Sequence, residues 1–378
     1  MNPSDLIAPA APTGLPAPFW FIELFKVLGF ALHAVMMNIW FAGIIIAMVL
    51  GWRGSTHQRH IATRIMNAMP IIIAIGINLG IVPLLFLQLA YYRVFYPATI
   101  LMAWPWMGVI ALLLVAYYSV YIYVVNLRTK GEKMPGKFRA FGWLGAILFV
   151  AISFLFVNAM TLMANPGNWL GIWKKTSFAG AVYGIGLNLG DPMLWPRWLM
   201  FFGLAITTTA AFIAFDAGMF ARKEAPEYRA TAGTTSLVIY TIGIVIFALM
   251  GYWYMTTWPT EIRAHMMQGQ LQILTLATGL ALGLPWLLIL WQRKNPTSTG
   301  AILIAITQFA VIGLNATSRQ IKQNLQLSSI MDLTKQPVHT QTIPLLIFLA
   351  LFVIALGIVI WMITKITKAA PHAEANAG

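Results

Sequence analysis

Nine apolar runs, each long enough to cross a bilayer as a helix, dominate this sequence. A bilayer core requires about 20 predominantly apolar residues per helix, and short loops with charged residues separate the runs. Only 9% of the residues are charged, whereas a soluble domain is typically about 25% charged, so a soluble fold would lack a polar shell. The expected spans are residues 20–50, 67–92, 100–126, 138–163, 195–221, 234–256, 269–291, 300–318 and 344–365.

No run alternates between apolar and polar residues with a period of two, which argues against a transmembrane β-barrel. The sequence therefore predicts an all-α integral membrane protein with nine transmembrane helices in one domain, residues 19–368. Residues 1–18 are rich in Pro and are expected to form an extended lead-in outside the cytoplasm. Residues 369–378 are expected to form a flexible tail.

The basic residues alternate between two sets of loops, and their asymmetry predicts the orientation. The loops within residues 53–64, 128–139, 222–229, 293–294 and 365–368 hold more Lys and Arg than the loops between them. Cytoplasmic loops carry the excess of basic residues, so the N-terminus is expected outside and the C-terminus inside. The expected location is a bacterial inner membrane, with several passes among the membrane lipids. These loops account for the net charge of +14, so no nucleic-acid partner is expected.

Polar side chains within the apolar runs are the first candidates for a site, because they are costly in a bilayer. His33 lies in the first run, where an imidazole can serve as a haem ligand, a quinone partner or a structural hydrogen-bonding group. Glu23 and Lys26 lie three residues apart, which favours a local ion pair near the outer interface. Asp216 lies about a turn from Arg222, a spacing that favours a salt bridge.

A second candidate site lies in the outer segment "WPTEIRAHMMQGQ". Its side chains Glu261, Arg263 and His265 place a carboxylate, a cation and an imidazole beside apolar surface, where they could bind a quinone headgroup and exchange its protons. A solvated connector is the alternative interpretation. Arg319 and Gln320 follow the eighth run, where the arginine could meet a haem propionate, a partner carboxylate or a lipid phosphate. No catalytic residue is assigned.

The order of several motifs is informative. The first run contains "LHAVMMNIWFAG", the second "GINLGIV", and the fourth ends in "FVNAMTLMANPGNW". The eighth run ends in the pair Arg319–Gln320. In this order, and over most of the chain, the sequence resembles subunit I of the cytochrome bd-type quinol oxidases. The resemblance implies a similar nine-helix bundle with the N-terminus outside, and His33 matches the ligand of a high-spin b haem.

Most of the haem ligands of that family have no counterpart here. Leu87 or Gln88 replaces the glutamate of the second helix, and Met107 replaces that of the third. The segment "WPRWLMFFG" lacks the His of the low-spin haem, and "LQILTLATGLALG" lacks its Met partner. The quinol-binding loop is reduced to a short segment around Glu261. The resemblance thus implies an oxidase-like scaffold with at most one b-type haem, for which His33 is the candidate metal ligand.

These features predict a membrane subunit of a respiratory electron-transfer complex that handles quinone or quinol near the outer face. The absence of Cys excludes iron–sulfur clusters and covalent c-type haem in this chain, so an external multihaem c-type cytochrome or iron–sulfur subunit is the expected partner. The outer loops 164–194 and 319–343 would be its docking surface. The alternatives are a haem-bearing bd-like quinol oxidase subunit and a redox-inactive structural anchor. A channel is not expected, because charges within the runs are too few to line a hydrated path.

Overall fold

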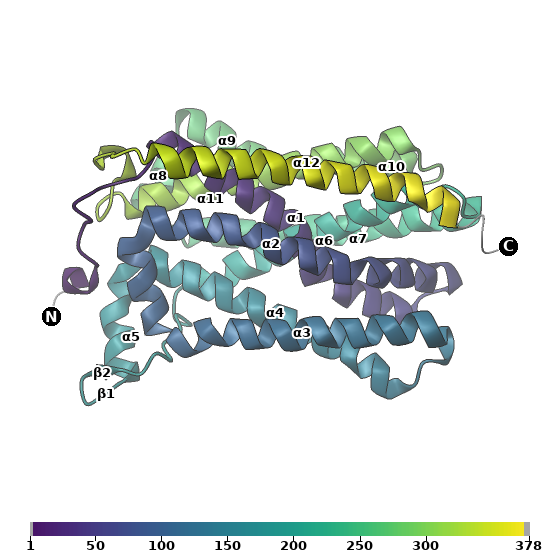
Figure 1. Cartoon of the computed structure of the whole chain (residues 1–378), viewed down its shortest axis with the longest axis horizontal. Helices are drawn as coiled ribbons and strands as arrows, with labels where there is room; N and C mark the ends of the chain where they lie inside the picture. Colours follow the sequence, from purple (N-terminus) through teal and green to yellow (C-terminus); the bar gives the residue numbers. More distant parts are fainter. Residues whose placement is uncertain (1–2, 374–378) are drawn as a thin grey trace.

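Long helices run side by side through the structure, and their connections lie at the two ends of the bundle (Figure 1). This computed structural model describes the backbone of residues 3–373, with side chains except at 3, 4, 132, 359, 362, 363 and 366–373. Among the described residues, eight helical segments are long and apolar enough to cross a membrane, as judged by length and composition. The prediction of an all-α, multi-pass membrane protein is thereby confirmed.

The elements follow the expected apolar runs. Their bounds are η1 Pro3–Leu6, α1 Phe19–Arg53, α2 Thr56–Leu101, α3 Ala103–Lys130, η2 Gly131–Lys133, α4 Gly136–Ala164, η3 Pro166–Asn168, α5 Trp169–Thr176, β1 Ser177–Phe178, β2 Ala181–Val182, α6 Leu194–Met219, α7 Pro226–Thr256, α8 Thr260–Met266, α9 Gly269–Leu280, α10 Gly283–Gln292, α11 Ser298–Leu327, η4 Leu333–Lys335 and α12 Thr342–Ala373. The helices α9 and α10 together occupy the expected seventh span.

Local chemistry sets several helix ends. At the start of α2 the Ser55 hydroxyl accepts a hydrogen bond from the backbone N–H of Gln58, whose side chain accepts one from Ser55 N, 3.0 Å away. This reciprocal pair satisfies two N–H groups that have no partner inside the helix. α4 ends at Ala164, because Asn165 precedes a proline and such residues disfavour helical geometry.

The helix α2 corrects the expected boundary between the second and third spans. It extends past residue 92 to Leu101, with a non-helical residue at Tyr91. Pro97 has no N–H to donate to the carbonyl of Arg93, and the backbone N–H of Ala8 donates to that carbonyl instead, at 3.0 Å. The expected interhelical loop is therefore a kinked helical extension, stabilised by the N-terminal lead-in.

The lead-in is packed against the segment that precedes α12. Leu15 is 3% exposed, its N–H donates to the carbonyl of Pro337 at 2.8 Å, and it forms a parallel bridge with Val338. Gly14 has a φ of +63°, and a Cβ at this position would lie 2.1 Å from the Pro337 carbonyl oxygen. Only glycine combines this backbone conformation with so close an approach.

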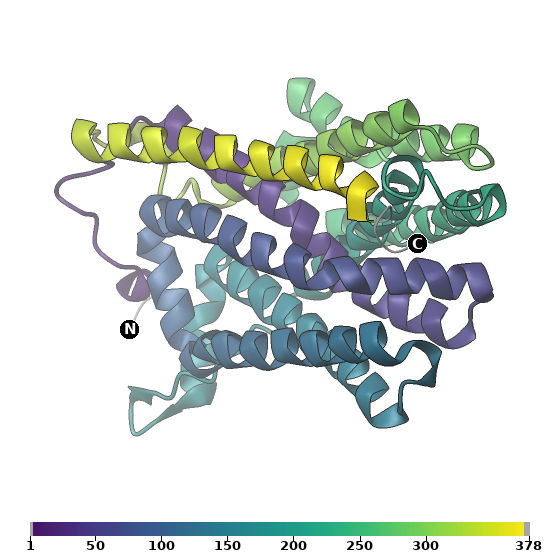
Figure 2. The same ribbon diagram turned by 45° about the vertical axis from the view of Figure 1, so that its right-hand side comes forward.

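The ninth expected span falls on α12, which lies along the outside of the bundle in both views (Figures 1 and 2). Its described apolar part is Thr342–Ile358, and its backbone continues to Ala373. The first part of the expected tail is therefore helical, and residues 374–378 lie outside the described part of the chain. Phe348 and Phe352 attach α12 to Phe25 of α1, with ring centroids 5.1 and 5.2 Å apart.

Arg64 and Asp216 join α2 to α6 at the end of the bundle opposite the lead-in. The guanidinium contacts both carboxylate oxygens, with Nε 2.6 Å from Oδ2 and Nη2 2.8 Å from Oδ1. Glu224 adds a contact to Arg64 at 3.4 Å. Arg222, the expected partner, donates to the Met219 carbonyl instead. The salt bridge predicted for Asp216 exists, but its partner comes from a different helix.

The short helix η1, α5, the β1–β2 hairpin and α8 share one end of the bundle, called here the outer end after the predicted orientation (Figure 1). The α1–α2 and α3–α4 connections and the end of α12 lie at the other end. With no native Cys, single-cysteine labelling can test this orientation. We expect Ala181→Cys, next to the hairpin turn, to react with an impermeant maleimide in intact cells. Lys133→Cys is expected to react only after permeabilisation, and the reverse pattern would contradict the orientation.

Candidate functional site

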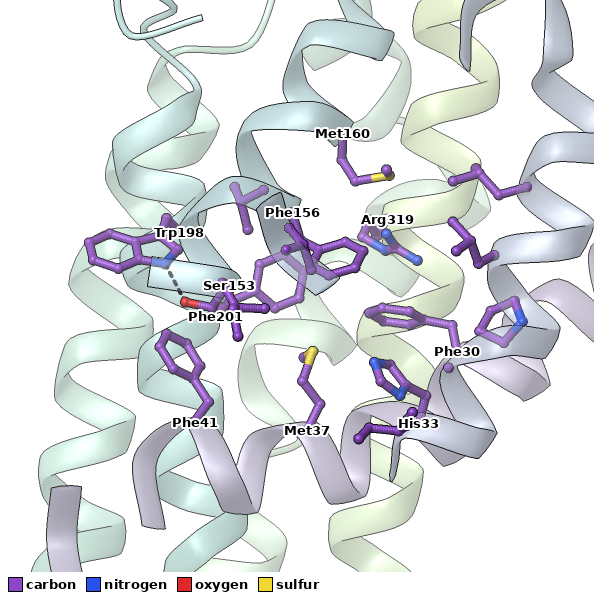
Figure 3. Close-up of a pocket in the computed structure, with 18 of the residues that line it drawn as sticks. Phe30, His33, Met37, Phe41, Ser153, Phe156, Met160, Trp198, Phe201 and Arg319 are labelled. Carbon is purple, nitrogen blue, oxygen red and sulfur yellow. Dashed lines mark hydrogen bonds between the residues drawn. The ribbon is translucent and has the colours of Figure 1, made fainter. Parts of the chain in front are cut away.

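An apolar pocket lies inside the bundle, with walls from α1, α2, α3, α4, α6 and α11 (Figure 3). Its volume is about 280 Å³, close to the lower end of the range for small-molecule sites, about 300–1,000 Å³. Aromatic and aliphatic side chains form most of the wall. Ser153 is occupied by a hydrogen bond from the Trp198 indole at 3.0 Å. The other strongly polar side chains of the wall are Lys26, His33, Arg197, Arg319, Gln320 and Gln323.

His33 reaches the pocket wall from α1 with a fixed tautomer. Its Nδ1 lies 2.8 Å from the backbone carbonyl oxygen of Gly76 in α2. A carbonyl only accepts, so Nδ1 carries the proton and Nε2 keeps its lone pair. Gly80 makes room for the ring, because a Cβ there would lie 2.8 Å from Cε1 of His33. Gly76 and Gly80, the two glycines of "GINLG", thus provide the hydrogen-bond acceptor and the space for the imidazole.

A hydrogen-bonded network joins the pocket to the outer end of α1. Lys26 pairs with Glu23 at 2.6 Å, as the spacing of these residues predicted, and its ammonium lies 4.1 Å from the centre of the Tyr91 ring. Gln320 donates to the Tyr91 hydroxyl at 2.8 Å and to Asn324 Oδ1 at 2.9 Å. Tyr91 also donates to Asn324. The kink in α2 therefore brings a phenol into contact with α1 and α11.

Arg319 of α11 lies above the ring of Phe30, with its Cζ 3.8 Å from the ring centre. Figure 3 shows Arg319, Phe30 and His33 one after another along the wall. Arg197 reaches the pocket from the first turn of α6 and is 6% exposed. The Nε atoms of both arginines are buried without a hydrogen-bond partner among the described residues. Gln323 Nε2 is in the same situation.

The cluster Glu261, Arg263 and His265 lies apart from this pocket. All three residues are exposed on the short helix α8, and His265 Nδ1 contacts the carbonyl oxygen of Glu261 at 2.8 Å. Beneath α8, Lys322 is 5% exposed and donates to the Tyr254 hydroxyl at 3.0 Å. The outer cluster is therefore a surface feature of the bundle.

The structure brings His33, Arg319 and Gln320 together in one pocket wall and leaves the α8 cluster outside it. Two residues of the wall, Arg197 and Gln323, were not predicted from the sequence as site residues. Arg197 was not considered as a site residue, although it lies within the expected span 195–221. Gln323 lies one turn beyond Arg319 on α11, and only the helical periodicity could have linked the two.

The pocket suits an amphiphilic ligand with acceptor atoms, since donors cluster on part of a mostly apolar wall. Among residues 3–373, no group of three or more His, Asp or Glu side chains could hold a metal ion. A single imidazole with a free Nε2 can nevertheless ligate one haem iron. Comparison of the sequence with protein-family models and with curated proteins finds no match.

Proposed function

We propose that this chain is the membrane subunit of a respiratory electron-transfer complex in a bacterial inner membrane, and that it binds quinone or quinol in the pocket of His33 and Gln320. One observation carries the proposal: an apolar pocket inside a membrane bundle has hydrogen-bond donors on one part of its wall. Quinone headgroups offer carbonyl oxygens that accept such bonds, and their isoprenoid tails need apolar surroundings.

Access from the lipid supports this ligand class. Ile81 of α2 and Phe156 of α4 both line the pocket, and they are 51% and 36% exposed. Because these side chains face both the pocket and the surroundings of the bundle, a ligand dissolved in the bilayer can enter between α2 and α4. A water-soluble substrate would have no advantage on this route.

The outer connections supply a surface for an external partner. The segment after α5 carries Phe178, Tyr183 and Ile185, which are 73%, 58% and 51% exposed. Exposed apolar side chains in one short segment are typical of a protein or membrane contact. An extracytoplasmic multihaem cytochrome c or iron–sulfur subunit docked there would receive or supply the electrons of the quinone.

A second candidate function is a haem-bearing, bd-like quinol oxidase subunit. It is favoured by the tautomer of His33, whose Nδ1 is occupied by the Gly76 carbonyl and whose Nε2 has no hydrogen-bond partner among the described residues. One b-type haem with a single axial imidazole would supply one-electron redox chemistry. His33 would hold the iron, and its backbone partner would orient the ring.

Quinone and haem contents of the purified chain test both functions. We expect wild-type protein to retain about one quinone or quinol per chain, and His33→Ala to retain roughly fivefold less quinol. The Nε2 lone pair of His33 can accept a hydrogen bond from a quinol hydroxyl, and one such buried bond contributes about 1 kcal/mol. The matched control His265→Ala, outside the pocket, should retain the wild-type amount. Quinone and haem would be measured by extraction and by the pyridine haemochrome assay.

Wild-type protein without quinone would contradict the proposal, and one b haem per chain that is lost in His33→Ala would favour the second function. Because the helices pack through their own interfaces, His33→Ala should still assemble with its partners. Mass spectrometry of co-purifying subunits would identify those partners. A chain that holds neither quinone nor haem would be a structural anchor.

A further inference from the structure

Two arginines line the pocket without a counter-ion. Of the three cations in the wall, Lys26 is neutralised by Glu23 at 2.6 Å. Arg197 and Arg319 form no ion pair with any described carboxylate, and their Nε atoms have no hydrogen-bond partner.

The neighbouring carboxylate cannot serve as this counter-ion. Asp191 is 2% exposed and accepts hydrogen bonds from Asn168 at 3.1 Å, Asn188 at 3.0 Å and the backbone N–H of Met193 at 2.8 Å. Asn165 donates to it as well. Its oxygens are committed to ordering the segment between α4 and α6. No carboxylate among the described residues therefore forms an ion pair with Arg197 or Arg319.

Buried charges without partners are costly in a membrane protein, and such residues mark ligand sites. A neutral quinone can accept hydrogen bonds from an arginine but cannot neutralise it. A carboxylate or a phosphate does both, because its oxygens match the planar fork of a guanidinium. The ligand must also have a large apolar part, since the wall around the arginines is mostly apolar.

We propose that Arg197 and Arg319 form an anion subsite that holds the carboxylate or phosphate of a membrane amphiphile, with the apolar part of that molecule in the remainder of the pocket. This site goes beyond the proposed function, because it requires a negative charge whatever neutral molecule the His33 side of the pocket binds. The charge can come from an acidic lipid or from the carboxylates of a prosthetic group such as haem.

Thermal unfolding of the full chain in nanodiscs tests the subsite. The probes are phosphatidylcholine alone, the same lipid with phosphatidylglycerol, and the same lipid with oleate. We expect at least one acidic probe to raise the Tm of the wild-type chain by on the order of 5 °C, since a ligand that binds only the folded state stabilises it. The double variant Arg197→Gln with Arg319→Gln should lose this rise, and the exposed control Arg263→Gln should keep it.

Phosphatidylcholine nanodiscs provide the folding control. There the double variant should be at least as stable as the wild type, because it no longer buries two uncompensated charges. If it does not fold, each single variant is measured in the same way. Native mass spectrometry would identify the retained acid, and a haemochrome assay would reveal a haem whose retention depends on Arg197 and Arg319.

An equal rise in Tm for the double variant would overturn the subsite. A wild-type chain that retains neither an acidic amphiphile nor haem, and shows no rise, would overturn it too. The quinone content of the same samples is measured separately. Loss of the acid with the quinone retained therefore concerns only this subsite, and absence of quinone with the acid retained concerns only the proposed function.

Discussion

Replacement of Gly243 by leucine is expected to prevent α6 and α7 from packing. A Cβ at Gly243 would lie 2.6 Å from Thr207 Cγ2, 2.8 Å from the Thr207 backbone nitrogen and 3.0 Å from the Gly203 carbonyl oxygen. Backbone atoms cannot move aside as a flexible side chain can. Overpacking costs about 1–3 kcal/mol in ordinary cores, and we expect at least the upper value here, because membrane helices pack through such small residues.

Thermal unfolding and size-exclusion chromatography of the detergent-solubilised protein would measure this effect. The matched control is Gly108→Leu in α3, because no atom lies within 4 Å of a Cβ at that position. The control should elute and unfold like the wild type. Equal Tm values for Gly243→Leu and Gly108→Leu would show that the contact between α6 and α7 is not the constraint inferred here.

Replacement of Asp216 by alanine is expected to destabilise the inner end of the bundle by about 2–3 kcal/mol. Removing one partner of a buried ion pair typically costs about 3–5 kcal/mol, and the lower value reflects the partial exposure of Arg64 and Asp216, 25% and 17%. The cost arises because Arg64 keeps its charge and loses both short contacts. Glu224, 3.4 Å away, can replace only part of them.

A double variant separates two causes of destabilisation: the unpaired charge of Arg64 and the loss of packing. Arg64→Leu combined with Asp216→Ala should recover most of the lost stability, because no unpaired cation remains. Urea or thermal unfolding in a single detergent would compare the stabilities of the wild type, Asp216→Ala and the double variant. If the double variant is less stable than Asp216→Ala, the guanidinium stabilises the bundle through contacts other than its ion pair with Asp216.

The apolar runs were sufficient to predict the helices, because span length and hydropathy depend on the bilayer and not on tertiary partners. The predicted boundary between the second and third spans was wrong, because a contact distant in sequence stabilises the end of α2. The residues around Arg93 look like a loop when read alone, but the carbonyl that Pro97 leaves free is satisfied by Ala8, far away in the sequence. Local rules cannot reveal such a partner.

The site was predictable only in part. Their polarity within or beside apolar runs drew attention to His33 and Arg319, and the structure places both in the pocket. Proximity in sequence misled for one ion pair, and the role of the cluster on α8 stays a prediction. Arg222 was paired with Asp216, and the three charged residues near Glu261 were considered as a site although α8 exposes them to the surroundings.

The bridge between Leu15 and Val338 has a consequence for the order of biogenesis. The segment that Leu15 contacts is made late in translation, so the first segment of the chain remains at the membrane surface without this partner while the helices insert. Until this segment emerges, the N–H of Leu15 and the carbonyls of Leu15 and Pro16 lack their native hydrogen-bond partners. Chains arrested before residue 338 should therefore be cleaved by protease between η1 and α1. The complete, released chain should resist cleavage there.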